Sequence, residues 1–281
     1  MDHFVYNSSP VKRTQLTPLL FSFLALASPC LAQNRAVKST ETNSRFSFDE
    51  GAIIRGDKAA KKLALVFTGD EFADGAETII RLLKRRGVKA SFFFTGRYYR
   101  NANFKSSIQH LKRDGHYLGA HSDEHLLYCD WNQRDKLLIS REKFVDDLNR
   151  NYLAMKAFGI SKDDARFFLP PFEWYNRSIS DWTEGMGLQL INFTPGTRSN
   201  ADYTTPEMKN YVSSDAIMQR IKEYEARDPA KLNGFILLLH IGVAPERTDK
   251  FYDRLDDLIN WLGGNKYQLV RIDQLLKAKS N

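Results

Sequence analysis

The feature that most constrains the fold is a regular alternation of short apolar runs and helical patterns. The apolar runs, typical of buried strands, cover residues 63–67, 89–95, 116–120, 166–169, 188–193, 234–240 and 267–272. Segments with apolar residues at helical spacing separate them, and such alternation is typical of a parallel sheet covered by helices. Seven units in about 220 residues suit a closed barrel better than an open sheet. We therefore predict an α/β fold, a (β/α) barrel with about seven parallel strands.

Composition limits the classes of partner. The chain has 281 residues, and its 42% hydrophobic and 27% charged content is sufficient for a large core without disulfides. The formal charge of +7 is spread along amphipathic segments such as "RLLKRRG". Because no basic stripe interleaved with aromatic residues is present, we expect no nucleic-acid partner. The sequence does not predict the oligomeric state, and Cys129 is expected to be a buried small hydrophobic residue.

The N-terminus is typical of an export signal. Lys12 and Arg13 precede an apolar run over 19–27 that is too short to span a membrane. We expect residues 1–32 to be a signal peptide and the mature protein to be periplasmic or secreted, with no transmembrane span. Lipid attachment at Cys30 is the less favoured alternative, because Pro29 fits a lipid-attachment box poorly. Residues 33–58 are polar and are expected to form a linker before a domain at 59–281.

Polar residues follow three of the predicted strands, and the carboxyl ends of parallel strands are where barrel sites lie. Asp70 and Glu71 follow the first strand. His121 and His125 follow the third, and if they begin a helix both imidazoles lie on one face and can bind one metal. The alternative is two surface histidines. His240 ends the sixth strand, either as a structural residue or as a general acid.

An aromatic segment follows the fourth strand in "RFFLPPFEWYN", which also contains Glu173. Its two prolines stiffen the loop, and its rings either stack on sugar faces or cap the core. "LLYCDW" is a similar segment. The residues that we expect to contact substrate are Pro171, Phe172, Trp174, Tyr175 and Trp131.

Over about residues 60–275 the sequence resembles the polysaccharide deacetylases of carbohydrate esterase family 4, which include nodulation deacetylases. The matching stretches are "ALVFTGDEF", "GVKASFFFTG", "DGHYLGAHSDEH", "RFFLPPF" and "ILLLH". The resemblance implies a distorted (β/α) barrel and a divalent metal held by one Asp and two His. It also implies attack of metal-bound water on an N-acetyl or O-acetyl carbonyl of a sugar, with a second Asp as base and the last His as acid.

The sequence departs from this pattern in three places. The two aspartates of the family align with Thr68 and Gly69, and the arginine before the proline pair aligns with Leu169. Loss of both partners together is consistent, because a buried arginine without its carboxylate would be an unpaired charge. The acidic and Trp motif near the fifth strand is absent from "INFTPGTRSN". We therefore expect His240 to lack an orienting carboxylate.

These features together predict an exported, metal-dependent carbohydrate deacetylase that acts on an acetylated glycan. The expected metal ligands are Asp70, His121 and His125, with zinc favoured and Co, Mn or Ni as alternatives. Glu71 is the first candidate for the base, Glu173 the second, and His240 the acid. The main alternative is a carbohydrate-binding pseudoenzyme that keeps the barrel and the metal but lacks a base. A metal-dependent hydrolase of another bond is a third.

Overall fold

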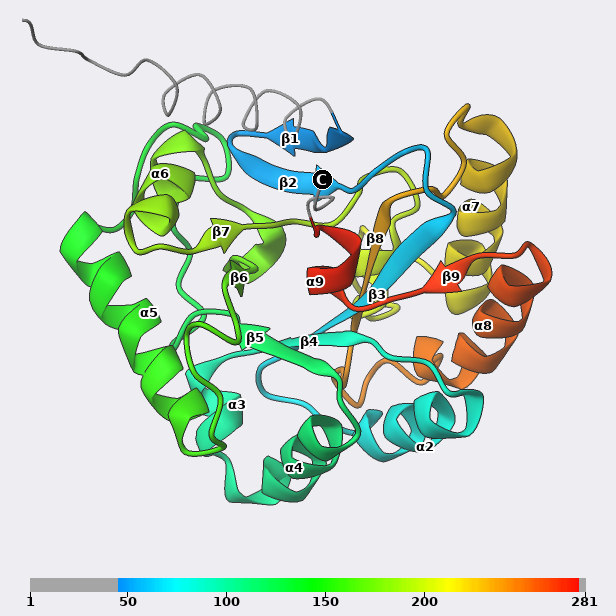
Figure 1. Cartoon of the computed structure of the whole chain (residues 1–281), viewed down its shortest axis with the longest axis horizontal. Helices are drawn as coiled ribbons and strands as arrows, with labels where there is room; N and C mark the ends of the chain where they lie inside the picture. Colours follow the sequence, from blue (N-terminus) through cyan, green and yellow to red (C-terminus); the bar gives the residue numbers. More distant parts are fainter. Residues whose placement is uncertain (1–44, 278–281) are drawn as a thin grey trace, which may run out of the picture. The chain divides into compact units, whose positions relative to one another are not determined.

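A parallel sheet curled into a half-barrel forms the centre of the molecule in a computed structural model that describes residues 45–277 (Figure 1). The sheet order is β7-β6-β5-β4-β3-β8, with β9 paired to β3, and every pairing is parallel. The seven-stranded distorted barrel predicted from the sequence is confirmed. The strands, with a separate hairpin β1-β2, are β1 (Ser47–Asp49), β2 (Ala52–Arg55), β3 (Lys62–Gly69), β4 (Ser91–Phe94), β5 (Tyr117–Ala120), β6 (Phe167–Phe168), β7 (Gln189–Leu190), β8 (Phe235–His240) and β9 (Gln268–Leu269).

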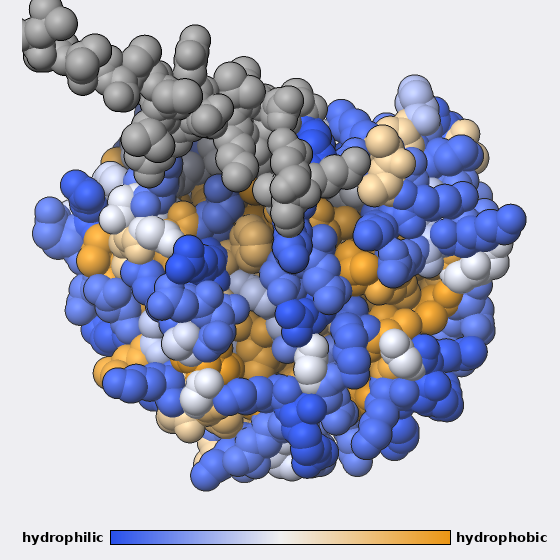
Figure 2. Space-filling model, viewed as in Figure 1, coloured by the Kyte–Doolittle hydropathy of each residue, from blue (hydrophilic) through white to orange (hydrophobic). Residues whose placement is uncertain are grey.

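Helices surround the sheet on the outside (Figure 1). Their polar faces form most of the surface seen in Figure 2, with apolar residues between them. Ser140 caps α5, the longest of the described helices, by accepting a hydrogen bond from the backbone N–H of Lys143. The helices are α2 (Ala76–Arg86), α3 (Gly96–Arg100), α4 (Lys105–Arg113), α5 (Arg141–Lys156), α6 (Arg177–Gly185), α7 (Ser214–Arg227), α8 (Leu255–Gly264) and α9 (Ile272–Leu275), with 3₁₀ turns η1 (Ala102–Phe104), η2 (Pro171–Glu173), η3 (Ser199–Ala201) and η4 (Phe251–Arg254).

The strands are buried on both faces, as their continuously apolar sequences require. Phe67 of β3 stacks on Phe92 of β4, with ring centroids 5.0 Å apart, and both rings are buried. At the end where the strands begin, the backbone N–H of Ile272 in α9 donates to the Ser91 hydroxyl. Helix α9 therefore packs at this end, and the residues that follow the strands lie at the opposite end.

The β1-β2 hairpin lies beside the gap between β7 and β8. Ile53 of β2 forms a parallel bridge with Ile191, and the backbone N–H of Gly56 donates to the carbonyl of Gly234 just before β8. Residues 33–58, expected to be a linker, thus contain two strands in the described part. The domain begins before residue 59, because the apolar side chain of Ile53 is buried in the core.

The expected signal peptide at 1–32, including Cys30, lies outside the described residues. Within 45–277, no helix is long and apolar enough to cross a membrane. Cys129 is buried, as predicted, and its thiol is free.

Candidate functional site

The carboxyl ends of the strands surround a pocket of about 540 Å³. In the register of the sheet, Thr68 near the end of β3 is the direct neighbour of His240 at the end of β8. The pocket contains eight of the site residues predicted from the sequence, including both histidines that follow β5. Its lining residues are Thr68, Gly69, Asp70, Glu71, Phe72, His121, His125, Trp131, Phe172, Glu173, Tyr203, Met208, His240, Gly242, Val243 and Ala244.

His121 and His125 meet edge to face, with ring centroids 5.1 Å apart. They do not begin a helix, so that part of the sequence argument was wrong. Instead, Ser122 and His125 adopt positive φ angles of 72° and 56°, which turn the chain within the loop. Such strained conformations of residues other than glycine concentrate at functional sites.

The ring of His121 is oriented so that Nε2 is free to act as a base or a metal ligand. Its Nδ1 lies 2.8 Å from the carbonyl oxygen of Leu169, so Nδ1–H donates and Nε2 keeps its lone pair. Burial, and then the neighbouring His125, lower the pKa of His121 well below its ordinary value. Burial also lowers the pKa of His125, to about 4, against the opposing charge of Asp70. Both imidazoles are therefore neutral at physiological pH.

Asp70 does not complete a metal site with these two histidines. Its carboxylate accepts hydrogen bonds from the Thr95 hydroxyl at 2.8 Å and from Nε of Arg97 at 3.1 Å, and Nη2 of Arg97 pairs with its second oxygen. Among residues 45–277, no three His, Cys, Asp or Glu side chains are arranged to hold a metal ion. The two neutral imidazoles could serve as metal ligands, but the Asp70 carboxylate is paired with Arg97. In this arrangement the three residues therefore do not form the predicted metal site.

His240 has an orienting carboxylate, contrary to the expectation from sequence. Nδ1 of His240 lies 2.6 Å from Oδ1 of Asp202, and the backbone N–H of His240 donates to Oδ2 at 2.9 Å. Burial would lower the pKa of His240, but the charge and hydrogen bond of Asp202 raise that pKa above its ordinary value. Asp202 follows the short turn η3, where no strand or helix pattern identifies it, and the acidic residue in "SNADY" was the only signal.

Glu173 lines the same pocket, and its carboxyl group interacts electrostatically with both His240 and Asp202. Phe172 and Glu173 both have positive φ, 58° and 52°, and the side chain of Asn192 donates to the carbonyl of Glu173 at 2.8 Å. The carboxyl group therefore projects from a strained turn held by a specific hydrogen bond. Burial is the main reason that the pKa of Glu173 is raised to about 7, with the charge of His240 opposing it and that of Asp202 adding to it.

Glu71 lies at the outer rim of the pocket. Its side chain is 66% exposed, and its nearest charged neighbour is Nη1 of Arg97 at 4.0 Å. The geometry therefore favours Glu173 over Glu71 as the base.

The predicted aromatic residues separate into two groups. Trp131 is 55% exposed, stacks on Trp174 and meets Phe172 edge to face, each at 5.7 Å between ring centroids. Trp131 and Phe172 line the pocket. Tyr175, in contrast, is fully buried and its hydroxyl hydrogen-bonds to Asp49, and Pro171 is buried as well. These two residues therefore belong to the core that supports the loop, and neither lines the pocket.

Thr68 and Leu169 occupy the positions where the resemblance implies an aspartate and its arginine partner. Both are buried, with Leu169 fully so. The Thr68 hydroxyl has no hydrogen-bond partner among the described residues, although it lies at the pocket. Because buried polar groups are nearly always satisfied, this hydroxyl is available to a bound molecule or water.

Comparison with known proteins gives one family. The polysaccharide deacetylase family model matches residues 55–191. A protein from Geobacillus stearothermophilus, described as an uncharacterized 30.6 kDa protein, is 24% identical over 230 residues, which is 82% of this chain and 76% of that protein. A chitin deacetylase from Pestalotiopsis sp is 24% identical over 178 residues, 63% of this chain, and the match spans about half, 53%, of its length.

Among solved structures, a CE4 family pseudoenzyme from Bacillus anthracis superposes with a TM-score of 0.63 at 20% identity. The match covers 82% of this chain and 70% of that one. A mutant of the same protein is described as having restored enzymatic activity. At this identity the similarity shows that the fold is shared.

Proposed function

Because this chain is a divergent member of the polysaccharide deacetylase family, we propose that it hydrolyses acetyl groups of a glycan in the pocket of His240. One observation carries the proposal. A histidine held by a buried carboxylate, Asp202, lines the same pocket as a second carboxyl group, Glu173, whose pKa of about 7 matches proton transfer near neutral pH.

The chemistry follows from these two groups. Ionised Glu173 accepts a proton from a water molecule as its oxygen attacks the acetyl carbonyl, and a tetrahedral intermediate forms. Protonated His240, whose pKa is raised by Asp202, then donates a proton to the leaving nitrogen or oxygen of the sugar as the carbon–heteroatom bond breaks. The products are acetate and a free amine or hydroxyl. The unpartnered Thr68 hydroxyl is a donor for the carbonyl oxygen.

Family members are generally metal-dependent, and a zinc ion remains part of the expectation from sequence. None of the steps above uses a metal, because Arg97 and Thr95 occupy the carboxylate of Asp70.

The proposed substrate is an acetylated glycan. Trp131 and Phe172 present aromatic surface beside the acid and base, and aromatic rings pack well against the apolar faces of sugars. We also propose that the protein is exported to the periplasm or secreted, which rests on the N-terminal sequence alone.

A carbohydrate-binding pseudoenzyme is the second candidate. It is favoured by the ion pair between Asp70 and Arg97 and by Thr68 and Leu169 at the positions of the family's charged pair. A pseudoenzyme would keep the aromatic rim and the barrel while releasing no acetate.

Acetate release separates the two candidates. The wild-type protein, His240→Asn and the surface control His110→Asn are incubated with N-acetylated chitin oligosaccharides, peptidoglycan glycan strands and O-acetylated xylan, and binding is measured in parallel. We expect acetate from the wild type and His110→Asn on at least one substrate, and a loss of about 10²–10⁴-fold in His240→Asn. Binding without acetate release by the wild type would establish the pseudoenzyme instead.

A further inference from the structure

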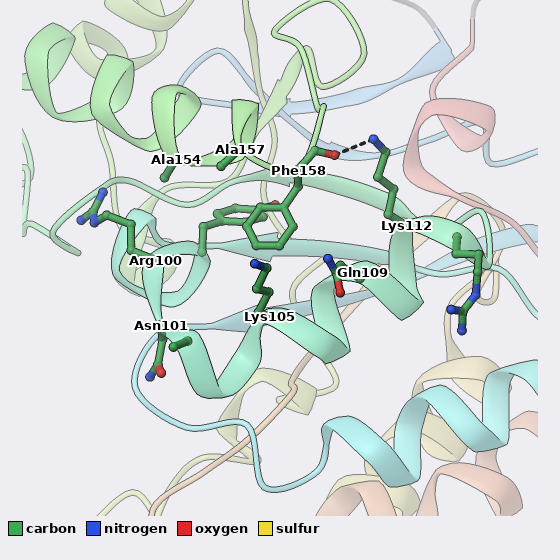
Figure 3. A pocket seen from close by; sticks show the side chains of 11 residues that line it. Arg100, Asn101, Lys105, Gln109, Lys112, Ala154, Ala157 and Phe158 are labelled. Atoms are coloured by element: carbon green, nitrogen blue, oxygen red, sulfur yellow. Dashed lines mark hydrogen bonds between the residues drawn. The ribbon is translucent and has the colours of Figure 1, made fainter.

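A second cavity, of about 720 Å³, lies outside the barrel between α3, α4 and the end of α5 (Figure 3). It shares no lining residue with the pocket of His240. Its lining residues are Tyr99, Arg100, Asn101, Ala102, Lys105, Gln109, Lys112, Arg113, Ala154, Ala157 and Phe158. Four of these are cations, and no carboxylate is among them, so the lining residues are basic.

Three of the four cations already have partners. Arg100 pairs with Asp123 through two hydrogen bonds, at 2.6 and 3.1 Å. Lys112 donates to the backbone carbonyl of Phe158 at 2.5 Å, the contact drawn in Figure 3. Arg113 lies 3.8 Å from Asp114. These contacts fix the walls of the cavity.

Lys105 is different, because it has no hydrogen bond or ion pair to any described residue. Gln109 follows it by four positions on α4, so the two side chains share one face of the helix. Both extend toward the ring of Phe158 in Figure 3. Phe158 packs on the buried Tyr99, with ring centroids 5.8 Å apart, which makes an aromatic wall opposite an unpaired ammonium and an amide.

We propose that this cavity binds an acidic sugar residue of a glycan. The ring of Phe158 packs against the apolar face of the sugar, Lys105 pairs with its carboxylate, and Gln109 hydrogen-bonds to a hydroxyl. This combination suits a carboxylate on a partly apolar ring. A nucleic acid fits less well, because one unpaired cation and one aromatic wall do not form a track for a phosphate backbone.

The position of the cavity links it to the proposed function, on which the choice of a glycan rests. Helix α3 carries Arg97, which contacts Asp70 of the pocket, and Arg100, which lines the cavity. One short helix, α3, thus contacts both sites. In this proposal the cavity selects glycans that carry negative charge.

The proposal is tested by binding rather than by turnover. Oligogalacturonate and a neutral chitin oligosaccharide of equal length are titrated calorimetrically into wild type, Lys105→Gln and Lys222→Gln, the last an exposed lysine on α7 with the same change of charge. We expect oligogalacturonate to bind wild type more tightly than the neutral chain does. Lys105→Gln should weaken it by about two- to fivefold, the range of an exposed ion pair, and Lys222→Gln should not.

Two results would overturn the proposal: equal binding of oligogalacturonate by Lys105→Gln and wild type, or tighter binding of a single-stranded DNA oligonucleotide that depends on Lys105. The same titration with His240→Asn separates this site from catalysis. A protein that releases no acetate but loses oligogalacturonate binding only in Lys105→Gln would refute the proposed activity and leave this site in place.

Discussion

The carboxylate of Asp202 binds His240 at two points, the ring Nδ1–H and the backbone N–H. The two contacts fix the tautomer, so Nε2 is the atom free to exchange a proton with a substrate. They also fix the end of β8 relative to the turn that carries Asp202. Because Asp202 is only 3% exposed, its charge acts on His240 with little screening by solvent.

Asp202→Asn should lower the rate of acetate release and change its pH dependence. The charge and hydrogen bond of Asp202 hold the pKa of His240 above its ordinary value, and without them burial lowers it. The protonated acid then persists only at lower pH, so the basic limb of the kcat profile should move toward lower pH. The loss of rate near neutral pH should fall in the range of about 10²–10⁴-fold for a general acid. An unshifted limb would show that His240 is not the acid.

Glu173→Gln should abolish proton acceptance while retaining the shape of the side chain. We expect a loss of about 10²–10⁴-fold in acetate release, with the affinity for the glycan nearly unchanged. Glu71→Gln is the matched comparison, because Glu71 lies in the same pocket but is exposed. Greater loss in Glu71→Gln than in Glu173→Gln would return the role of base to the loop after β3.

Glu173→Gln should also stabilise the protein at high pH. The pKa of Glu173 is about 7 in the folded chain and has an ordinary value of 4.5. Below 4.5 the group is neutral in both states, so the variant gains nothing. As pH rises from 4.5 to 7, the unfolded chain ionises more easily and the wild type loses stability. Above pH 7 the variant should be more stable by up to about 3 kcal/mol in urea unfolding. Equal stability at about pH 8 would contradict burial of the carboxyl group.

Trp131→Ala should weaken substrate binding with little effect on folding. Trp131 is more than half exposed, and its ring packs against two other rim aromatics, Phe172 and Trp174. Loss of the stacking surface, worth about 0.5–1.5 kcal/mol, should raise KM about two- to tenfold while kcat is retained. Leu153→Ala, an exposed apolar residue on α5, is the control. A fall in kcat at constant KM would exclude a binding role.

The barrel was predictable because each strand is a continuous apolar run and each helix has apolar residues at helical spacing. The local sequence pattern therefore agrees with the global fold. The gathering of Asp70, His121, Glu173 and His240 was predictable for the same reason, since each follows the end of a parallel strand. Asp202 was not, because a carboxylate after an irregular turn leaves no periodic signal. The hairpin over 47–55 was not predicted, because the few apolar residues that it buries lie among polar residues and give no clear strand pattern.

The state of Asp70 could not be predicted for a different reason. Its nearest partners are Thr95 and Arg97, more than twenty residues later, at the start of α3, which follows β4. Sequence spacing places a carboxylate at a rim but does not say whether a metal or a guanidinium neutralises it. The choice depends on side-chain geometry between neighbouring strands.

Arg97→Gln should therefore favour metal binding at the histidine pair. Arg97 makes a bidentate ion pair with Asp70, and its removal leaves that carboxylate free to turn toward His121 and His125. An ion pair as exposed as this one contributes about 0.2–1 kcal/mol, so zinc affinity should rise about two- to fivefold. Equilibrium dialysis of zinc against wild type, Arg97→Gln and the surface-pair control Arg166→Gln measures this directly. The gain should disappear in Arg97→Gln combined with His121→Ala; a gain that survives there, or no gain at all, would show that Asp70 and the histidines do not share a metal.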